Sequence, residues 1–177
     1  TFSVDGEQYV ALLAGWGGAW GLASLKDPTA AAVKTGTNQG RLFVFKLGGR
    51  QTVAALAPTR GPQEKPPAVT GDAATIEKGF VLFHQTCTVC HGFFAESAGV
   101  VPDLRLSTPD VFSQYKDIVL DGALAANGMA SFADNLNADD VEAIRQYVLS
   151  QSNALWTANN PGDATPPGPG APTPTTP

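Results

Sequence analysis

The sequence predicts a chain in two parts, in which a few strands of a larger β-sheet structure precede a small all-α domain. Residues 1–48 contain short apolar runs broken by glycines, which are typical of strands. Residues 49–72 hold four prolines among small and polar side chains and predict a linker. Residues 73–155 carry apolar side chains at helical spacing. Residues 156–177 contain seven of the fourteen prolines and predict a disordered tail.

Three strands are expected in the N-terminal part. Residues 2–4 run through Asp5-Gly6, a dipeptide that favours a type I′ turn, into residues 8–13, which gives a hairpin. Residues 41–47 form the third strand and are apolar on both faces. So small a sheet can neither cover its faces nor pair its edges. We therefore expect these strands to belong to a larger sheet structure and the chain to begin inside a domain.

Three helices are expected in the all-α domain, each preceded by a capping residue. Asp72 caps the first helix, Thr108 the second and Asn137 the third. The periodicity of 3.6 residues gives their buried faces, which are in turn Ile76, Gly79, Phe80 and Phe83; Val111, Phe112, Tyr115, Ile118 and Val119; and Val141, Ile144, Tyr147 and Val148. Gly79 suits a close crossing of the first helix with Tyr147 of the last.

A cofactor motif, Cys87-Thr88-Val89-Cys90-His91, follows the first helix directly and contains both cysteines of the chain. Two cysteines separated by two residues and followed by a histidine have the spacing at which a c-type haem is attached. The two thiols can add to the two vinyl groups of a haem, and the adjacent histidine can reach the iron. We therefore predict that Cys87 and Cys90 bind haem c covalently and that His91 is the proximal iron ligand.

Two other functions of a Cys-x-x-Cys pair are less compatible with this sequence. A structural zinc site needs about four ligands. After the motif itself the remaining soft ligand is His84, which is too close to the motif to complete such a site. A thiol redox motif is typical of a βαβ context, which the sequence does not predict. Haem attachment therefore fits better than a zinc site or a thiol redox site.

Met129 is the only methionine of the chain, and it lies in the loop between the second and third helices. A core gap-filler is the commonest role of methionine. The loop position and the preceding Gly128 instead favour an iron ligand opposite His91. A thioether ligand stabilises ferrous iron and raises the reduction potential, as an electron carrier needs. Ligation by histidine and methionine also argues against oxygen binding or peroxidase chemistry at this haem.

Four residues near the motif have weaker assignments. The carbonyl of Pro102 is a candidate acceptor for the Nδ1 proton of His91, which would orient the imidazole, and the alternative is an ordinary loop proline. Arg105 is a candidate partner of a haem propionate, and the alternative is a solvated side chain. Phe93 and Phe94 are expected to be core contacts rather than a path for electrons.

Charge and hydropathy limit the partners and the location. Residues 73–155 carry a net charge of −6, which argues against nucleic acid and favours a basic partner. No apolar run approaches the roughly 20 residues of a membrane span, and no signal peptide heads the chain. In the systems that this motif resembles, haem is attached to thiols outside the bacterial cytoplasm. We therefore expect a periplasmic protein whose export signal has been lost or lies elsewhere.

Two resemblances cover all but the proline-rich tail. Residues 73–155 resemble a class I cytochrome c in the strings TCTVCHG, VVPDLR, NGMASF and DDVEAIRQYV. Residues 2–48, with VDGEQYVALLAGWGGAWGL and GRLFVFKLGG, resemble the last strands of the eight-bladed propeller of alcohol dehydrogenases that depend on pyrroloquinoline quinone (PQQ). Their order is that of the quinohaemoprotein alcohol dehydrogenases. The implied fold is the end of an eight-bladed β-propeller, incomplete in this chain, joined by a linker to an all-α class I cytochrome c domain.

The resemblance also implies a function. In that family the propeller holds PQQ and a calcium ion, oxidises an alcohol, and passes electrons one at a time to the attached haem. An external acceptor, such as a blue-copper protein or another cytochrome, then receives them. The quinone-binding residues, calcium ligands and catalytic aspartate belong to earlier blades, so no catalytic residue is assigned here and the expected partner is the remaining propeller. By this resemblance, Gly15 to Trp20 is expected to pack between blades, and the alternative is a position near the junction of the propeller and the cytochrome.

The alternative function comes from a different class of protein. It is a free-standing monohaem c-type electron carrier, with an unrelated β-extension and no catalytic activity of its own. A companion polypeptide that completes the sheet would distinguish the enzyme from the carrier.

Overall fold

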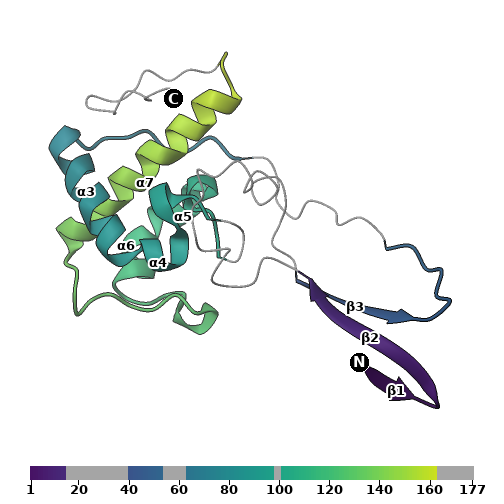
Figure 1. Ribbon diagram of the computed structural model, residues 1–177. Helices are drawn as coiled ribbons and strands as arrows, with labels where there is room; N and C mark the ends of the chain where they lie inside the picture. The colour runs from purple at the N-terminus through teal and green to yellow at the C-terminus, as the bar shows by residue number, and fades with distance from the viewer. Residues whose placement is uncertain (15–39, 54–62, 98–100, 163–177) are drawn as a thin grey trace.

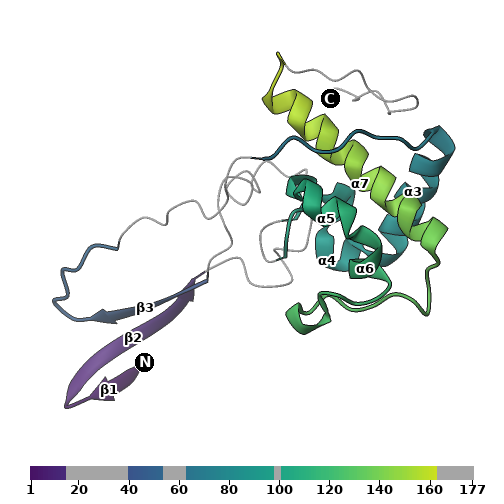
Figure 2. The same ribbon diagram turned by 180° about the vertical axis from the view of Figure 1, so that it is seen from behind.

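A computed structural model of the chain describes residues 1–14, 40–53, 63–97 and 101–162. The segment Gly15 to Trp20 and the tail beyond residue 162 lie outside the described residues. A small antiparallel sheet and a helical domain lie apart from each other in both ribbon views (Figures 1 and 2). No helix within the described ranges is long and apolar enough to span a bilayer.

The sheet contains β1 (Phe2–Val4), β2 (Glu7–Ala14) and β3 (Arg41–Lys46), paired antiparallel in that order. The turn between β1 and β2 has positive φ at Asp5, 51°, and at Gly6, 80°. A type I′ turn requires positive φ at both central residues, so the predicted hairpin is confirmed.

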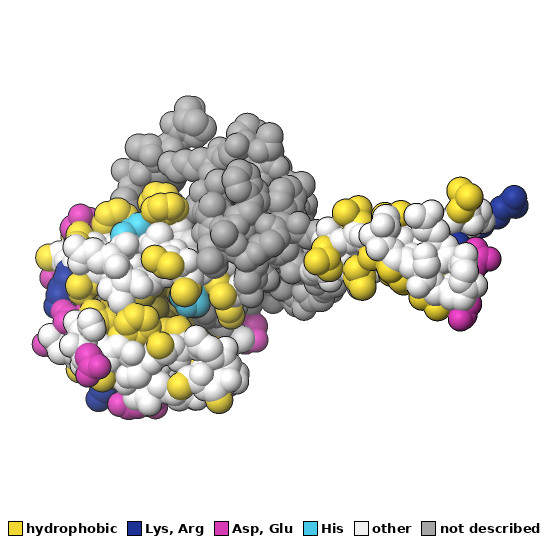
Figure 3. All heavy atoms as spheres, turned by 60° about the horizontal axis from the view of Figure 1, so that its bottom comes forward, with side chains coloured by type: hydrophobic (Ala, Val, Ile, Leu, Met, Phe, Trp, Pro, Cys, Tyr) yellow, Lys and Arg dark blue, Asp and Glu magenta, His cyan; other side chains and the backbone are white. Residues whose placement is uncertain are grey.

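Large apolar side chains are exposed on both faces of the sheet. Leu12 and Leu13 point to opposite faces of β2 because side chains alternate along a strand, and they are 55% and 82% exposed. The other exposed large apolar side chains of the three strands are Phe2, Val4, Val10, Leu42, Val44 and Phe45. Figure 3 shows hydrophobic side chains along this part of the surface. As expected, the sheet does not cover its own faces.

Among its described residues, the helical domain contains five helices and three short 3-10 turns. In chain order these elements are α3 (Ala73–Thr86), α4 (Thr88–His91), η2 (Phe93–Ala95), η3 (Leu104–Leu106), α5 (Pro109–Ser113), α6 (Tyr115–Val119), η4 (Ala125–Asn127) and α7 (Ala138–Asn159). The three predicted caps are confirmed. Asp72 accepts from the backbone N–H of Thr75, Thr108 accepts from Val111, and Asn137 forms a capping box at the start of α7.

The first and last helices cross closely at Gly79, as the sequence predicts. A Cβ atom added at Gly79 would lie 2.9 Å from Cβ of Tyr147 and closer still to the carbonyl oxygen of Ala143. Phe83 and Val148, next to this crossing, are fully buried. The pair α3 and α7 therefore forms the scaffold on which the motif that follows α3 is mounted.

Two helices differ from the sequence prediction. The second predicted helix is divided at Gln114 into α5 and α6. The hydroxyl of Ser113 donates to the carbonyl of Asp110 at 2.7 Å, a local bond that competes with helical pairing. The last helix continues to Asn159, four residues beyond the boundary expected at residue 155.

The second half of the predicted linker, residues 63–72, is held against α7, and we call it the strap. The side chain of Asn153 donates to the carbonyl of Pro67 at 2.8 Å. The side-chain oxygen of Gln146 accepts from the backbone N–H of Thr70 at 2.9 Å. The strap therefore belongs with the helical domain, a packing that the prolines of the linker do not predict.

Candidate haem attachment site

The attachment motif begins where α3 ends. Cys87 is the C-cap of α3, with its backbone N–H bonded to the carbonyl of Phe83 at 2.8 Å, and the chain then turns into the short helix α4. Cys87 is half-buried and Cys90 is exposed, and both thiols are free. The local structure thus presents two thiols and the imidazole of His91 within five residues.

Burial, together with a smaller effect of the neighbouring Cys90, raises the pKa of the Cys87 thiol to about 12. A dithiol that exchanges disulfides needs the opposite, because the reactive species is a thiolate with a lowered pKa. The environment of Cys87 therefore does not suit a thiol redox site.

The imidazole of His91 is 8% exposed and is held in one orientation. Its Nδ1 lies 3.2 Å from the carbonyl oxygen of Pro102. Because a carbonyl only accepts, Nδ1 carries the proton and Nε2 is left with a lone pair. Desolvation lowers the pKa of His91, although the bond to Pro102 opposes this shift. The ring is therefore neutral at neutral pH, which is the form that binds a metal ion.

Arg105 lies in the loop that carries Pro102, and its guanidinium faces two carboxylates. Nε and Nη2 donate to Asp103 at 3.0 and 2.8 Å, and Nη1 lies 3.1 Å from Glu96. The carbonyl of Arg105 accepts from the hydroxyl of Ser152 at 2.7 Å. Sequence reasoning considered a haem propionate or solvent as partners and missed these carboxylates.

Met129 is placed in the loop that follows η4, after Gly128 with φ of 92°. Its backbone N–H bonds to the carbonyl of Leu124 at 3.2 Å. The side chain is partly buried and packs against the hydrophobic core of the domain. Ligation of iron by this thioether remains a prediction.

The aromatic pair after the motif is exposed, which corrects the expectation that it belongs to the core. Phe93 is 47% exposed and Phe94 is 39% exposed. The chain turns here through positive φ at Gly92, Phe94 and Ala95, so that Ala95 is buried in place of the rings. The Nε2 atom of His84 accepts from the backbone N–H of Phe94 at 3.4 Å, which links α3 to this turn.

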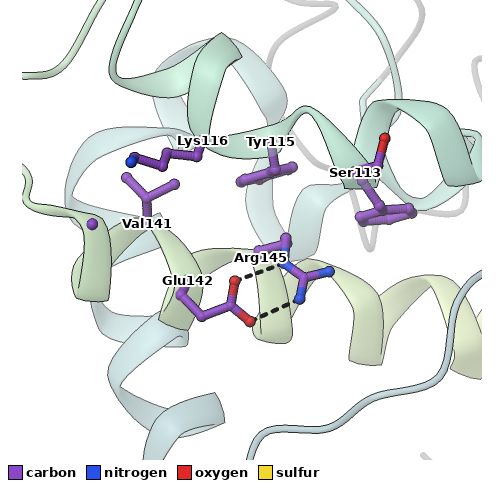
Figure 4. A pocket seen from close by; sticks show the side chains of 8 residues that line it. Ser113, Tyr115, Lys116, Val141, Glu142 and Arg145 are labelled. Carbon is purple, nitrogen blue, oxygen red and sulfur yellow. Dashed lines mark hydrogen bonds and ion pairs between the residues drawn. The ribbon is translucent and has the colours of Figure 1, made fainter.

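A separate hollow of about 330 Å³ lies between α5, α6 and α7 (Figure 4). Its lining includes Phe112, Tyr115 and Val141, with the ion pair of Glu142 and Arg145 at one side. No residue of the attachment motif lines this hollow, so it is distinct from the haem site.

The residues of the motif fit a covalently bound haem. They supply two free thiols and one neutral, oriented imidazole, which are the protein groups of a c-type site. Within the four described ranges, no cluster of three or more histidine, cysteine, aspartate or glutamate side chains is arranged to hold a metal ion directly.

Comparison with known proteins identifies the same domain. The family model described as cytochrome c oxidase, cbb3-type, subunit III matches residues 74–148. The quinohemoprotein alcohol dehydrogenase ADH-IIG of Pseudomonas putida is 39% identical over 156 residues, covering 88% of this chain and 21% of the relative. The dehydrogenase subunit of the alcohol dehydrogenase (quinone) of Acetobacter aceti is 34% identical, with 88% and 21% covered.

The solved structures agree with this result. The structure of ADH-IIG from Pseudomonas putida superposes with a TM-score of 0.76 at 36% identity, over 92% of this chain and 23% of that one. The chain spans about a fifth of the length of the curated relatives that it matches. The chain therefore matches the segment of the quinohaemoprotein alcohol dehydrogenases that contains the cytochrome c domain.

Proposed function

We propose that this chain is the electron-transfer portion of a periplasmic, PQQ-dependent alcohol dehydrogenase. In this proposal Cys87 and Cys90 hold haem c covalently, and His91 and Met129 ligate its iron. Electrons pass from reduced PQQ in the remaining propeller, by way of this site, to an external acceptor such as a blue-copper protein or another cytochrome. A bound haem supplies reversible one-electron chemistry at its iron.

The observation that carries the proposal is the orientation of His91. The ring is buried and donates from Nδ1 to Pro102, so Nε2 is free for iron beside two thiols. Such a bond fixes the ring orientation and raises the basicity of the ligand. We propose that Pro102 has this orienting role.

The proposed sixth ligand suits electron transfer. Met129 lies in a loop, and its partly buried side chain packs against the core. A thioether stabilises ferrous iron and leaves no open coordination position for a substrate. Histidine and methionine together therefore support an electron-transfer function rather than oxygen chemistry.

We further propose that β1, β2 and β3 complete the propeller, whose other blades hold PQQ and calcium. The uncovered apolar side chains of the sheet support this assignment, since a sheet of three short strands needs further strands to bury its faces. The superposition with ADH-IIG extends over 92% of the chain and so includes residues outside the cytochrome domain. No PQQ or calcium ligand is assigned to this chain.

The acceptor is proposed from charge. Residues 73–155 carry a net charge of −6, and an acidic domain attracts a basic partner and raises the rate of encounter. The free-standing carrier, the alternative function, is less well supported, because the relatives found by comparison are dehydrogenases several times longer than this chain.

The proposal is tested with the full-length enzyme that contains this segment. The enzyme is loaded with PQQ and calcium, a panel of alcohols is added without any other reductant, and the ferrous absorption bands are followed. At least one alcohol is expected to reduce the haem, whereas enzyme prepared without PQQ stays ferric. If none reduces it while dithionite does, the haem is not connected to alcohol oxidation and the assignment fails.

A further inference from the structure

A shielded ion cluster lies beside the loop that contacts the proximal histidine. The guanidinium of Arg105 donates twice to Asp103, from Nε at 3.0 Å and Nη2 at 2.8 Å, and Nη1 lies 3.1 Å from Glu96. The side chains of Arg105, Asp103 and Glu96 are 20%, 5% and 24% exposed. Pairs so shielded from water are screened less by salt than surface pairs, and a two-point arginine fork also fixes geometry.

The cluster joins the two ends of the segment that runs from the motif to Pro102. Glu96 lies five residues after His91, and Asp103 is covalently next to Pro102. Because the carbonyl of Pro102 accepts the Nδ1 proton of His91, the separation of Glu96 and Asp103 bears directly on that hydrogen bond. The guanidinium of Arg105 bridges Glu96 and Asp103 and so fixes the distance between them.

The backbone of the same residue is anchored from the opposite side. The carbonyl of Arg105 accepts from the hydroxyl of Ser152 in α7 at 2.7 Å and from the side-chain amide of Gln63 in the strap at 3.0 Å. Ser152 is fully buried. Side chain and main chain of Arg105 therefore attach the loop to the motif segment, to α7 and to the strap at once.

The partners of Arg105 favour this structural role over contact with a haem propionate. Two carboxylates already balance its positive charge. The Nε and Nη2 groups, which would bind a propionate best because they can donate two parallel hydrogen bonds, already donate to Asp103. A third carboxylate would add a further negative charge to the cluster and would need to displace one of the present partners to obtain the same geometry.

We propose that Arg105 is a positioning residue for the proximal ligand, which acts by clamping Glu96 to Asp103 and so fixing the Pro102 carbonyl against His91. This inference rests on the proposed attachment of haem at the motif, and it assigns to Arg105 a role in setting the basicity of the imidazole. The reduction potential of the haem then depends on a residue that touches neither the iron nor the histidine.

The test measures the hydrogen bond itself. The 177-residue chain carrying haem is labelled with ¹⁵N-histidine and reduced with dithionite, and exchange of the His91 Nδ1 proton with water is followed by NMR. Arg105→Lys keeps the charge but loses the planar fork. We expect exchange to become roughly tenfold faster, because losing a charge-assisted bond lets the loop open.

Arg145→Lys is the matched control. Arg145 also makes a two-point pair, donating from Nε at 2.7 Å and Nη2 at 2.8 Å to Glu142, but it lies on α7 at the hollow of Figure 4 rather than in the proximal loop. This variant is expected to leave exchange at His91 unchanged while losing the same kind of ion pair.

Glu96→Gln decides between a clamp and a propionate contact, and it serves if Arg105→Lys does not fold. Under the clamp, Glu96→Gln also accelerates exchange and the haem potential shifts with it. If Arg105→Lys or Glu96→Gln shows the same exchange rate as Arg145→Lys, the clamp is overturned. An unchanged rate in Glu96→Gln would instead fit a contact of Arg105 with a haem propionate, because such a contact does not need Glu96. An unaltered chain that takes up no haem overturns this inference and the proposed function together, whereas a failed clamp leaves the proposed function standing.

Discussion

The carbonyl of Ala143 in α7 faces Gly79 in α3 so closely that no side chain fits between the two helices. α3 leads directly into Cys87, and α7 holds the strap and the Arg105 loop. The crossing therefore sets the position of the attachment motif relative to the loop that orients His91. Stability of the domain and geometry of the proposed haem site depend on the same contact.

Substitution Gly79→Ala is expected to destabilise the domain by about 3 kcal/mol, because an added methyl group in a well-packed crossing forces the helices apart. Urea unfolding of the haem-loaded protein, followed by far-UV circular dichroism, measures the loss. Gly162→Ala adds the same methyl group where nothing lies within 4 Å, and it should leave the midpoint nearly unchanged. Equal urea midpoints for the two variants would show that the two helices can accommodate a methyl group at their crossing.

The N-terminus of α7 depends on its cap. The side-chain oxygen of Asn137 accepts from the backbone N–H groups of Asp139 and Asp140 at 2.9 and 3.0 Å. Asn137→Ala should therefore cost about 1 kcal/mol in the free energy of unfolding, as is usual for a lost N-cap. Asn135→Ala, at an exposed position of the preceding loop, should change it by less than about 0.5 kcal/mol. A cost at Asn137 no larger than at Asn135 would contradict the capping role.

Acid should weaken the contact between α3 and α7. Hydrogen bonding from Lys78, at 2.7 Å, and from the backbone of Asn137 lowers the pKa of Asp140 below its ordinary value of 3.8. A carboxyl with a lowered folded-state pKa stabilises the fold above its unfolded pKa, and this contribution disappears as the pH falls through the folded-state pKa.

The corresponding variant is Asp140→Asn. Its unfolding free energy should be lower than that of the unaltered protein at about pH 7, and the two should converge by about pH 2. Denaturant titrations across this range measure the difference. Asp134→Asn, in the exposed loop before α7, is the control and should follow the unaltered protein throughout. A constant difference for Asp140→Asn at every pH would exclude the charged form of Asp140 as its cause.

Much of the helical domain could be predicted because its signals are local. The caps at Asp72, Thr108 and Asn137 are read from one residue and the three that follow it. The close crossing at Gly79 could be predicted since a glycine on an apolar helix face has little other use. These interactions were confirmed at the expected positions.

The features that sequence reasoning missed involve contacts between distant residues or unusual backbone angles. The strap is held by Gln146 and Asn153, which lie about eighty residues after it in the chain. The periodicity of apolar residues cannot predict a hydrogen bond over such a separation. The exposure of Phe93 and Phe94 results from left-handed φ values, which residues other than glycine and asparagine seldom adopt and which no local motif announces. The carboxylate partners of Arg105 are likewise set by the fold of the loop.

Replacement of the proposed sixth ligand, Met129→Ala, should abolish the thioether-to-iron absorption band at the red edge of the ferric spectrum and lower the reduction potential. Leu124→Ala is the control, since Leu124 lies just before η4 and its backbone carbonyl accepts from the backbone N–H of Met129. The control should keep the band. Retention of the band in Met129→Ala would mean that another group ligates the iron.

The central claim is that electrons from an alcohol pass through the haem of this segment. Rapid mixing of the full-length enzyme, loaded with PQQ and calcium, with its alcohol in the absence of acceptor measures the rate of haem reduction. A parallel assay with a saturating acceptor measures steady-state turnover. The account predicts that the haem becomes ferrous at least as fast as the enzyme turns over. A haem that stays ferric without acceptor, or that becomes ferrous more slowly than the enzyme turns over with acceptor, would contradict it.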